Sequence, residues 1–177
     1  MSLLITLALY YRDTMSRGES RKLLGHNAYH WAIVVMPENS QGRECFEFDA
    51  TDAAEIDPVT FRMNNPTKDW WFRRKNNTNP SLSNKLLGRI VLGQLPSNTS
   101  IDNIEKIFSR VPLPVKHSNP EQSCVIWAVE AIRALQTQGW VDNVDINKLK
   151  DWALPYADDR KNGSKAKQSA IVRYNSR

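Results

Sequence analysis

The first half of the chain alternates short apolar runs with polar turns, a pattern that predicts β-strands. Leu3–Tyr11 is rich in branched and aromatic residues, and residues 29–36 form a second such run that Pro37 ends. After a polar segment at residues 38–43, Cys45–Thr51 alternates between apolar and polar positions. These features predict one strand followed by a hairpin of two more.

The alternation also predicts which side chains share a face of the third strand. Phe46 and Phe48 lie on one face, whereas Cys45, Glu47 and Asp49 lie on the other. Two carboxylates therefore project from the same side of this strand.

The segment from residue 51 to residue 83 contains several prolines and an Asn-rich stretch, so we expect it to be irregular. It carries an aromatic cluster at residues 70–72 (Trp-Trp-Phe) and a basic run at residues 73–75 (Arg-Arg-Lys). The aromatic cluster either packs over one edge of the core or lines a substrate cleft, because aromatic side chains commonly line ligand sites. Residues 85–95 predict a further strand.

Helical spacing of apolar residues begins only later in the chain. Ser100 suits the cap of a helix that extends to Phe108, and residues 145–154 predict a short amphipathic helix that Pro155 ends. Because strands come early and helices late, the predicted fold class is α+β, with an antiparallel sheet packed against a buried helix.

The most apolar helix is predicted over residues 119–137. Asn119 suits its N-cap, Pro120 its first turn and Gln122 the third position of a capping box, while Gly139 follows its last turn. Apolar residues occupy most of its circumference, which is typical of a helix inside a domain.

Cys124, near the start of that helix, has two interpretations. Free cysteine is among the most buried residue types, so the commoner case is a small apolar residue in the core. Alternatively, the positive end of a helix stabilises a thiolate, which is the reactive form of cysteine. The second interpretation requires a base.

His30 is the candidate base. Of the three histidines, His26 and His117 lie in predicted loops, whereas His30 opens a strand, which holds a ring more rigidly. It shares a strand face with Ala32 and Val34, and we expect that face to pack toward the cysteine helix. A histidine that makes one hydrogen bond at a strand edge fits the spacing equally well.

A third group would orient the imidazole ring, and the next strand offers Glu47 and Asp49. Cys45 shares their face and is expected to be a bystander. No metal or other cofactor is predicted, because the cysteines and histidines lack the close spacing of metal ligands.

The run Tyr-His-Trp-Ala-Ile-Val-Val at residues 29–35 closely resembles the H-W-A-[IL]-x-V strand of LRAT-like and NlpC/P60-like proteins, which carries their catalytic histidine. The segment Ser-Cys-Val-Ile-Trp-Ala-Val-Glu-Ala-Ile at residues 123–132 is similar to their cysteine helix. Histidine before cysteine is the order of the permuted, PPPDE-type members. The pairing of an H-W strand with a C-x-x-W helix also resembles an uncharacterised family of small fungal proteins.

This resemblance implies a permuted papain-like fold in which Cys124 is the nucleophile and His30 the base. The second histidine that these families often carry on the following strand is absent, which leaves Glu47 or Asp49 as the third catalytic group. Ser123 replaces the usual Asn before the cysteine, and the loop between the two motifs is long. The residues that we expect to contact substrate are Trp31, Trp70, Trp71, His117, Gln122, Ser123 and Trp127.

Length and composition indicate the domain organisation and the cellular location. The chain has 177 residues with 41% hydrophobic ones, enough for a single domain, which we place at residues 1–160, with a basic and partly flexible tail at residues 161–177. Two cysteines suit a reducing compartment. No apolar run reaches the length of a membrane span, and a soluble cytoplasmic protein is expected.

Three functions remain open at this point. The first is a cysteine-dependent enzyme that hydrolyses or transfers the acyl group of an amide, ester or thioester, from a small-molecule or peptide-like substrate. The second is a non-catalytic binding module whose contact surface is Trp70, Trp71 and the basic run at residues 73–75. The third starts from the net charge of +5. The usual explanation of such an excess is a solvated surface and a basic terminus, and the alternative is an anionic partner such as RNA or an aminoacyl-tRNA acyl donor.

Overall fold

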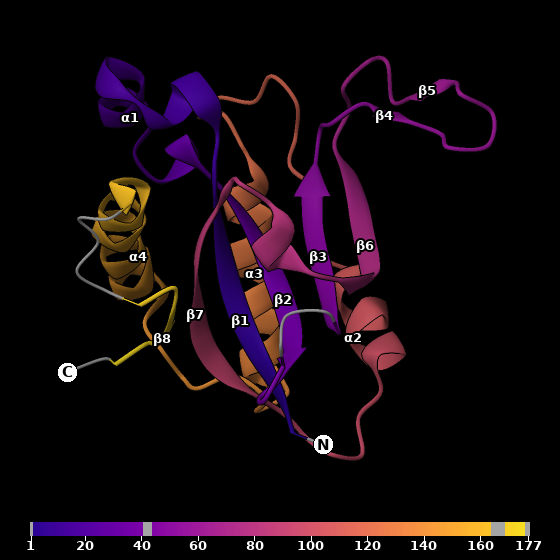
Figure 1. Ribbon diagram of the computed structural model, residues 1–177, viewed down its shortest axis with the longest axis vertical. Coiled ribbons are helices and arrows are strands. Elements are labelled where there is room, and N and C mark those ends of the chain that lie inside the picture. Colours follow the sequence, from indigo (N-terminus) through magenta and orange to yellow (C-terminus); the bar gives the residue numbers. More distant parts are fainter. Residues whose placement is uncertain (1, 41–43, 164–168, 176–177) are drawn as a thin grey trace.

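The computed structural model describes residues 2–40, 44–163 and 169–175, and these form an α+β fold around one mixed sheet (Figure 1). The sheet has six strands in the order β6-β3-β2-β1-β7-β8, and β4 and β5 form a separate two-stranded hairpin. The strands are β1 (Leu3–Tyr11), β2 (Tyr29–Pro37), β3 (Cys45–Thr51), β4 (Glu55–Ile56), β5 (Met63–Asn64), β6 (Trp71–Thr78), β7 (Leu86–Leu95) and β8 (Ile171–Arg173). The helices are α1 (Gly18–Leu24), α2 (Ile101–Phe108), α3 (Cys124–Thr137) and α4 (Ile146–Lys161).

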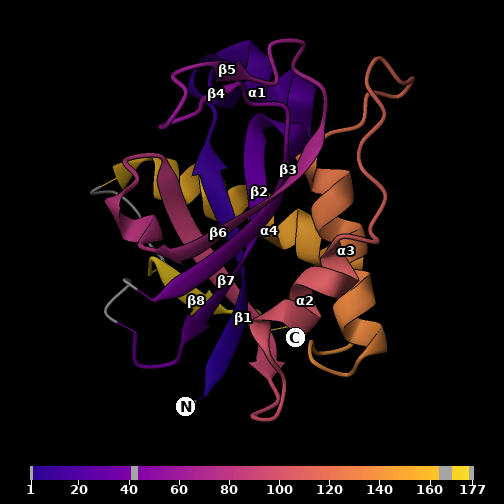
Figure 2. The same cartoon turned by 90° about the vertical axis from the view of Figure 1, so that its right-hand side faces the viewer.

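One face of the sheet is apolar and covered by helices. Figure 2 shows α2 and α3 on the same side of the strands. Alternate residues of β2, namely Trp31, Ile33 and Val35, are buried on this face, together with Phe48 of β3. The predicted positions of the first three strands, of β7 and of α2 with its Ser100 cap are confirmed.

The opposite face is partly open. A small apolar cluster that includes Leu4, Val34 and Cys45 covers part of it, and polar side chains such as Glu47 and Lys75 lie beside this cluster. Because β6 and β7 are separated by three strands, the chain between them must cross this face, and Figure 1 shows the segment at residues 79–85 doing so.

Four predictions of secondary structure are wrong. The sheet is mixed, because β8 pairs with β7 in parallel, and this strand lies within the expected tail. The expected irregular segment contains β4, β5 and β6. Helix α4 continues through Pro155, because Tyr156 and Ala157 beyond it are fully buried against the sheet, which outweighs the proline's cost of about 3 kcal/mol.

The fourth error concerns the start of the cysteine helix. It begins at Cys124 and not near Asn119, because the Ser123 hydroxyl accepts the Val125 N–H and acts as the N-cap. The side chain of Gln122 instead accepts the N–H of Val115, which folds the preceding loop back on itself. The predicted stop is confirmed, since Gly139 adopts a left-handed conformation two residues after the helix.

Gly93 fixes the end of this helix against the sheet. It forms a bridge with Val141, and a Cβ at position 93 would lie 2.2 Å from the Trp140 carbonyl oxygen. Backbone atoms cannot move aside as a flexible side chain can. We expect Gly93→Ala to lower the free energy of unfolding by about 1–3 kcal/mol in urea denaturation. The neighbouring residue Gln94 is exposed, so Gln94→Ala should change the free energy of unfolding by less than about 0.5 kcal/mol. Equal effects of the two substitutions would contradict the close packing of Gly93 against Trp140.

Candidate active site

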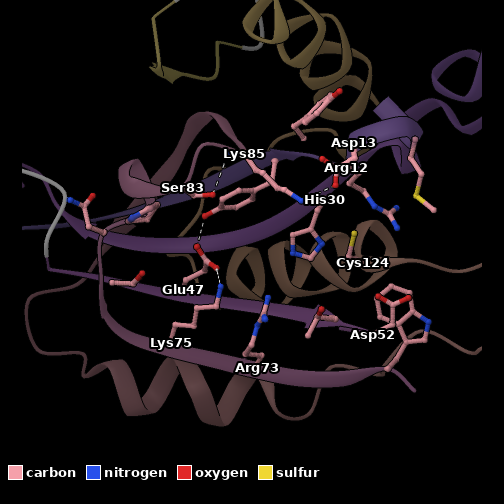
Figure 3. Close-up of a pocket in the computed structure, with 18 of the residues that line it drawn as sticks. Arg12, Asp13, His30, Glu47, Asp52, Arg73, Lys75, Ser83, Lys85 and Cys124 are labelled. Atoms are coloured by element: carbon pink, nitrogen blue, oxygen red, sulfur yellow. Dashed lines mark hydrogen bonds and ion pairs between the residues drawn. The ribbon is translucent and has the colours of Figure 1, made fainter. Parts of the chain in front are cut away.

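The candidate site lies where β2 and β3 part from one another. The ladder between them runs from Ile33↔Phe48 to Val35↔Phe46, although both strands continue past Ile33 and Phe48 toward the site. Helix α3 packs behind this part of the sheet, so its first residue, Cys124, reaches the opening (Figure 3).

Cys124 lies against the part of β2 with which β3 no longer pairs. Its thiol lies 4.0 Å from the carbonyl oxygen of Tyr29, and the N–H of Trp31 donates to its sulfur. In an extended strand these two backbone groups point to the same side, two residues apart. The sulfur thus contacts backbone groups of β2 on the side where the β3 ladder has ended.

The imidazole of His30 is held between Cys124 and Asp49. Its Nε2 lies 2.8 Å from Asp49 Oδ2, and its ring is coupled to the Cys124 sulfur by a hydrogen bond and by charge. Figure 3 shows the sulfur next to the ring. Because Nε2 contacts Asp49, Nδ1 is the ring nitrogen that remains for the thiol.

Asp49 is a buried carboxylate with cationic partners. Its side chain is 1% exposed, and Arg73 of β6 contacts both of its oxygens, with Nε 3.0 Å from Oδ1 and Nη2 2.7 Å from Oδ2. Burial raises the pKa of this carboxyl group, but His30 and Arg73 outweigh burial and lower the pKa to about 2. Arg73 also pairs with Glu55 of β4.

The local charges favour a thiolate–imidazolium pair. Burial raises the pKa of the Cys124 thiol, but His30, Arg12 and the Trp31 N–H bring it below its ordinary value of 9.0. Burial likewise opposes protonation of His30, yet Cys124 and Asp49 raise the pKa of its imidazole to about 10. At neutral pH both shifts favour a negative sulfur beside a positive ring.

A cavity of about 550 Å³ opens onto this pair from the polar face of the sheet. Cys124 and His30 lie in its wall, together with Tyr10 of β1 and Trp70, which directly precedes β6. The crossing segment between β6 and β7 forms the opposite wall and contributes Lys85. A volume of this size can hold a small molecule or a few residues of a peptide.

The two candidate carboxylates have different partners. Asp49 contacts His30, whereas Glu47 accepts hydrogen bonds from the Tyr10 hydroxyl and, at 2.8 Å, from Lys75 Nζ. Glu47 also lines the cavity, so it is placed to contact a ligand and not to orient the imidazole.

The four tryptophans expected to contact substrate differ in position. Trp31 and Trp127 are at most 1% exposed and pack in the core, so the structure does not place them at the cavity. Trp70 lines the cavity, and the indole N–H of Trp71 donates to the Ala53 carbonyl outside the cavity wall. Large apolar side chains are commonly buried in the core, so a position near His30 or Cys124 in the sequence does not place a tryptophan at the cavity.

The remaining predicted contacts belong to the loop before α3. His117 is exposed, and Gln122 bonds with the backbone of its own loop. Ser123 caps the helix and donates to Asn27 Oδ1 at 2.6 Å. Gln122 and Ser123 position the loop and the helix, and none of these three residues lines the cavity.

The expected face of His30 is wrong, although His30 does meet Cys124. Val34, on the same strand face, packs on the side away from α3, while the odd-numbered residues of β2 face the helix. The two side chains come together only because β2 and β3 part at this end, which no periodicity reveals.

Sequence reasoning missed Arg12 and Asn27 as parts of the site, and it assigned Arg73 only to the contact surface of a binding module. Alternation along residues 71–75 would have placed Arg73 and Lys75 on one face, had this segment been recognised as a strand. Arg12 and Asn27 lie in irregular segments that gave no comparable signal.

No metal or membrane feature accompanies the site in residues 2–40, 44–163 and 169–175. Within these ranges, no group of three or more His, Cys, Asp or Glu side chains is arranged to hold a metal ion. The same residues contain no helix that is both long and apolar enough to cross a bilayer.

The pH dependence of Cys124 alkylation tests the thiolate–imidazolium pair. In the wild-type protein we expect the midpoint of iodoacetamide labelling to lie below pH 9.0, because the pKa of the thiol is lowered. In His30→Ala the midpoint should rise above that of the wild type, since only Arg12 and the Trp31 N–H then oppose the effect of burial. Peptide mass mapping of the labelled protein across pH measures both midpoints.

Two variants on β3 supply a matched comparison. Asp49→Asn removes the anion that favours the imidazolium, so its labelling midpoint should move in the same direction as that of His30→Ala. Glu47→Gln changes a carboxylate on the same strand face that has other partners, and its midpoint should match the wild type. A profile that is the same in all four proteins would contradict the assigned pair.

Three comparisons with known proteins complete this description. The search of curated proteins found no match, and neither did the search of solved structures. Residues 4–175 match the model of the Family of unknown function DUF6914, which spans nearly the whole chain and includes the tail residues that form β8. The chain belongs to this family of unknown function.

Proposed function

We propose that this protein is a cysteine-dependent enzyme that hydrolyses or transfers an acyl group. One observation carries the proposal. The Cys124 thiol, at the first turn of a buried helix, is coupled to a His30 ring that bonds with the buried Asp49, and all of this lies at a cavity. A nucleophile, a base and an orienting group in contact are the parts that covalent acyl transfer requires.

In the first step, the Cys124 thiolate attacks the carbonyl carbon of an amide, ester or thioester bound in the cavity. The carbonyl oxygen gains a negative charge in the tetrahedral intermediate. Val125 and Ile126 direct their N–H groups to Ser123, which leaves the N–H of Cys124 as the first-turn donor for that charge. As the intermediate collapses, the His30 imidazolium gives its proton to the leaving group.

In the second step, neutral His30 takes a proton from the acceptor, which attacks the thioester and releases Cys124. Water as the acceptor gives a hydrolase, and an amine or alcohol gives an acyltransferase or cyclase. Asp49 keeps its charge throughout, because Arg73 remains paired with it, and it holds the ring with Nδ1 toward the sulfur.

We further propose that the fold is a permuted papain-like arrangement. The chain order supports this: the histidine strand β2 precedes β3, and the cysteine helix α3 follows later and packs against both. The α+β architecture is compatible with it, and the reactive thiol suits a reducing compartment such as the cytoplasm.

The two alternative functions receive less support from the contacts. For a binding module, Trp71 and the basic run at residues 73–75 would have to be available, but Arg73, Arg74 and Lys75 each pair with carboxylates of this chain. Binding of RNA requires a stripe of unpaired cations, so the same ion pairs weigh against it.

Trapping of an acyl-enzyme tests the proposed function. Incubation with an activated ester, such as p-nitrophenyl acetate, should add one acetyl group to Cys124 and release nitrophenolate. Intact mass and peptide mapping locate the adduct. We expect His30→Ala to slow acylation about 10²-fold or more, the usual size of general base catalysis.

Cys45→Ser is the matched control, because Cys45 is also buried but lies with Leu4 and Val34, away from His30. Its acylation rate should equal that of the wild type, whereas Cys124→Ala should give no adduct. Acylation of Cys124 at the same rate with and without His30 would rule out the proposed enzyme.

A further inference from the structure

The cations that line the cavity are not equivalent. Arg73, Lys75 and Lys85 each contact a carboxylate of the chain, namely Asp49 and Glu55, Glu47, and Asp13. Arg12 also lines the cavity, yet among the described residues no carboxylate lies within ion-pair distance of its guanidinium. One cation of the cavity wall thus keeps its charge available.

Backbone groups hold Arg12 in place. Its Nη1 donates to the Asn27 carbonyl at 2.7 Å, and its own N–H donates to Ser16 Oγ at 2.8 Å. The Ser16 hydroxyl in turn donates to the Ala28 carbonyl, directly before β2. A guanidinium held this way loses little conformational entropy when it binds a ligand.

The same residues place Arg12 beside the nucleophile. Asn27 accepts from Arg12 with its carbonyl and from Ser123 with its side chain, so one residue joins the arginine to the cap of the cysteine helix. Arg12 is near enough to Cys124 to lower the pKa of its thiol. Figure 3 shows Arg12, Cys124 and His30 at the same end of the cavity.

The charge balance changes during the reaction. Before acylation, the positive charges of Arg12 and His30 both interact with the negative charge of the Cys124 thiolate. After acylation the sulfur is neutral and His30 has given up its proton, so Arg12 is left without a counter-charge. An anionic group on the bound substrate would supply one, and a guanidinium binds carboxylate or phosphate through two parallel hydrogen bonds.

We propose that Arg12 is a substrate-binding residue that selects acyl compounds carrying one carboxylate or phosphate group close to the reacting carbonyl. This inference rests on the proposed function, since it assigns the substrate class of the same site. The pairing of the other cavity cations limits selection to a single anionic group.

Alkylation by two reagents of nearly equal size isolates the anion site. The Cys124 thiolate attacks the methylene carbon of iodoacetate or iodoacetamide, a C–S bond forms and iodide leaves. Neither reaction has an oxyanion intermediate, so a role of Arg12 in stabilising one would not affect either rate. The measured quantity is the ratio of the iodoacetate rate to the iodoacetamide rate at Cys124.

We expect Arg12→Gln to lower this ratio about tenfold or more, because the charge-assisted hydrogen bonds to the carboxylate of iodoacetate are lost. Any general loss of thiolate affects both reagents and cancels in the ratio. Arg12→Lys keeps the charge but not the planar pair of donors, so an intermediate ratio is expected. The control is the double variant Asp13→Asn and Lys85→Gln, which removes an ion pair of the same cavity without changing its net charge, and its ratio should equal that of the wild type.

Acyl donors then distinguish the two anions. Nitrophenyl monoesters of glutaric acid should acylate Cys124 faster than neutral pentanoate esters, and a phosphonate-bearing analogue shows whether phosphate is also accepted. A ratio unchanged in Arg12→Gln, or lowered equally in the Asp13→Asn and Lys85→Gln double variant, would overturn the anion site. If the rates of both reagents were the same in His30→Ala as in the wild type, the proposed enzyme would be overturned instead. The two failures can therefore be told apart.

Discussion

The buried carboxylate of Asp49 is the constraint on which the site depends. A charge with 1% exposure is costly unless it is paired, and the pairing here joins three strands: Asp49 on β3, His30 on β2 and Arg73 on β6. The same contacts fix the orientation of the imidazole, because Nε2 is committed to the carboxylate. The contact that compensates the buried charge of Asp49 therefore also leaves Nδ1 of His30 directed toward the thiol.

The parting of β2 and β3 is the second requirement, because side-chain alternation alone would separate the two reactive groups. His30 belongs to the open face of the sheet, and Cys124 belongs to the helix layer behind it. They meet because the ladder ends at Ile33, and the sulfur then contacts the Tyr29 carbonyl and the Trp31 N–H. Backbone groups beyond the end of the ladder gain a polar partner, and the thiolate gains a donor.

The sequence predicts local features of this fold and site better than long-range ones. Alternation along Cys45–Thr51 and the apolar content of α3 are local consequences of burial, and both predictions hold. The end of the β2–β3 ladder and the parallel pairing of β8 depend on residues far apart in the chain, and neither has a periodic signature. Local signals also compete: Ser123 and Asn119 are both good caps, and the hydrogen bonds of the preceding loop decide between them.

Net charge was the least informative feature, because it counts cations without their partners. Arg73 and Lys75 project from one face of β6 onto Asp49 and Glu47, whereas Arg74 projects from the other onto Asp102 and Glu105 of α2. The basic run at residues 73–75 suggests a polyanion-binding surface, but its side chains form ion pairs within the fold. What distinguishes Arg12 is the absence of such a partner among the described residues, and its guanidinium lies close to Cys124, the proposed nucleophile. The selectivity that we propose for this cavity therefore depends on one cation and not on the overall excess of positive charge.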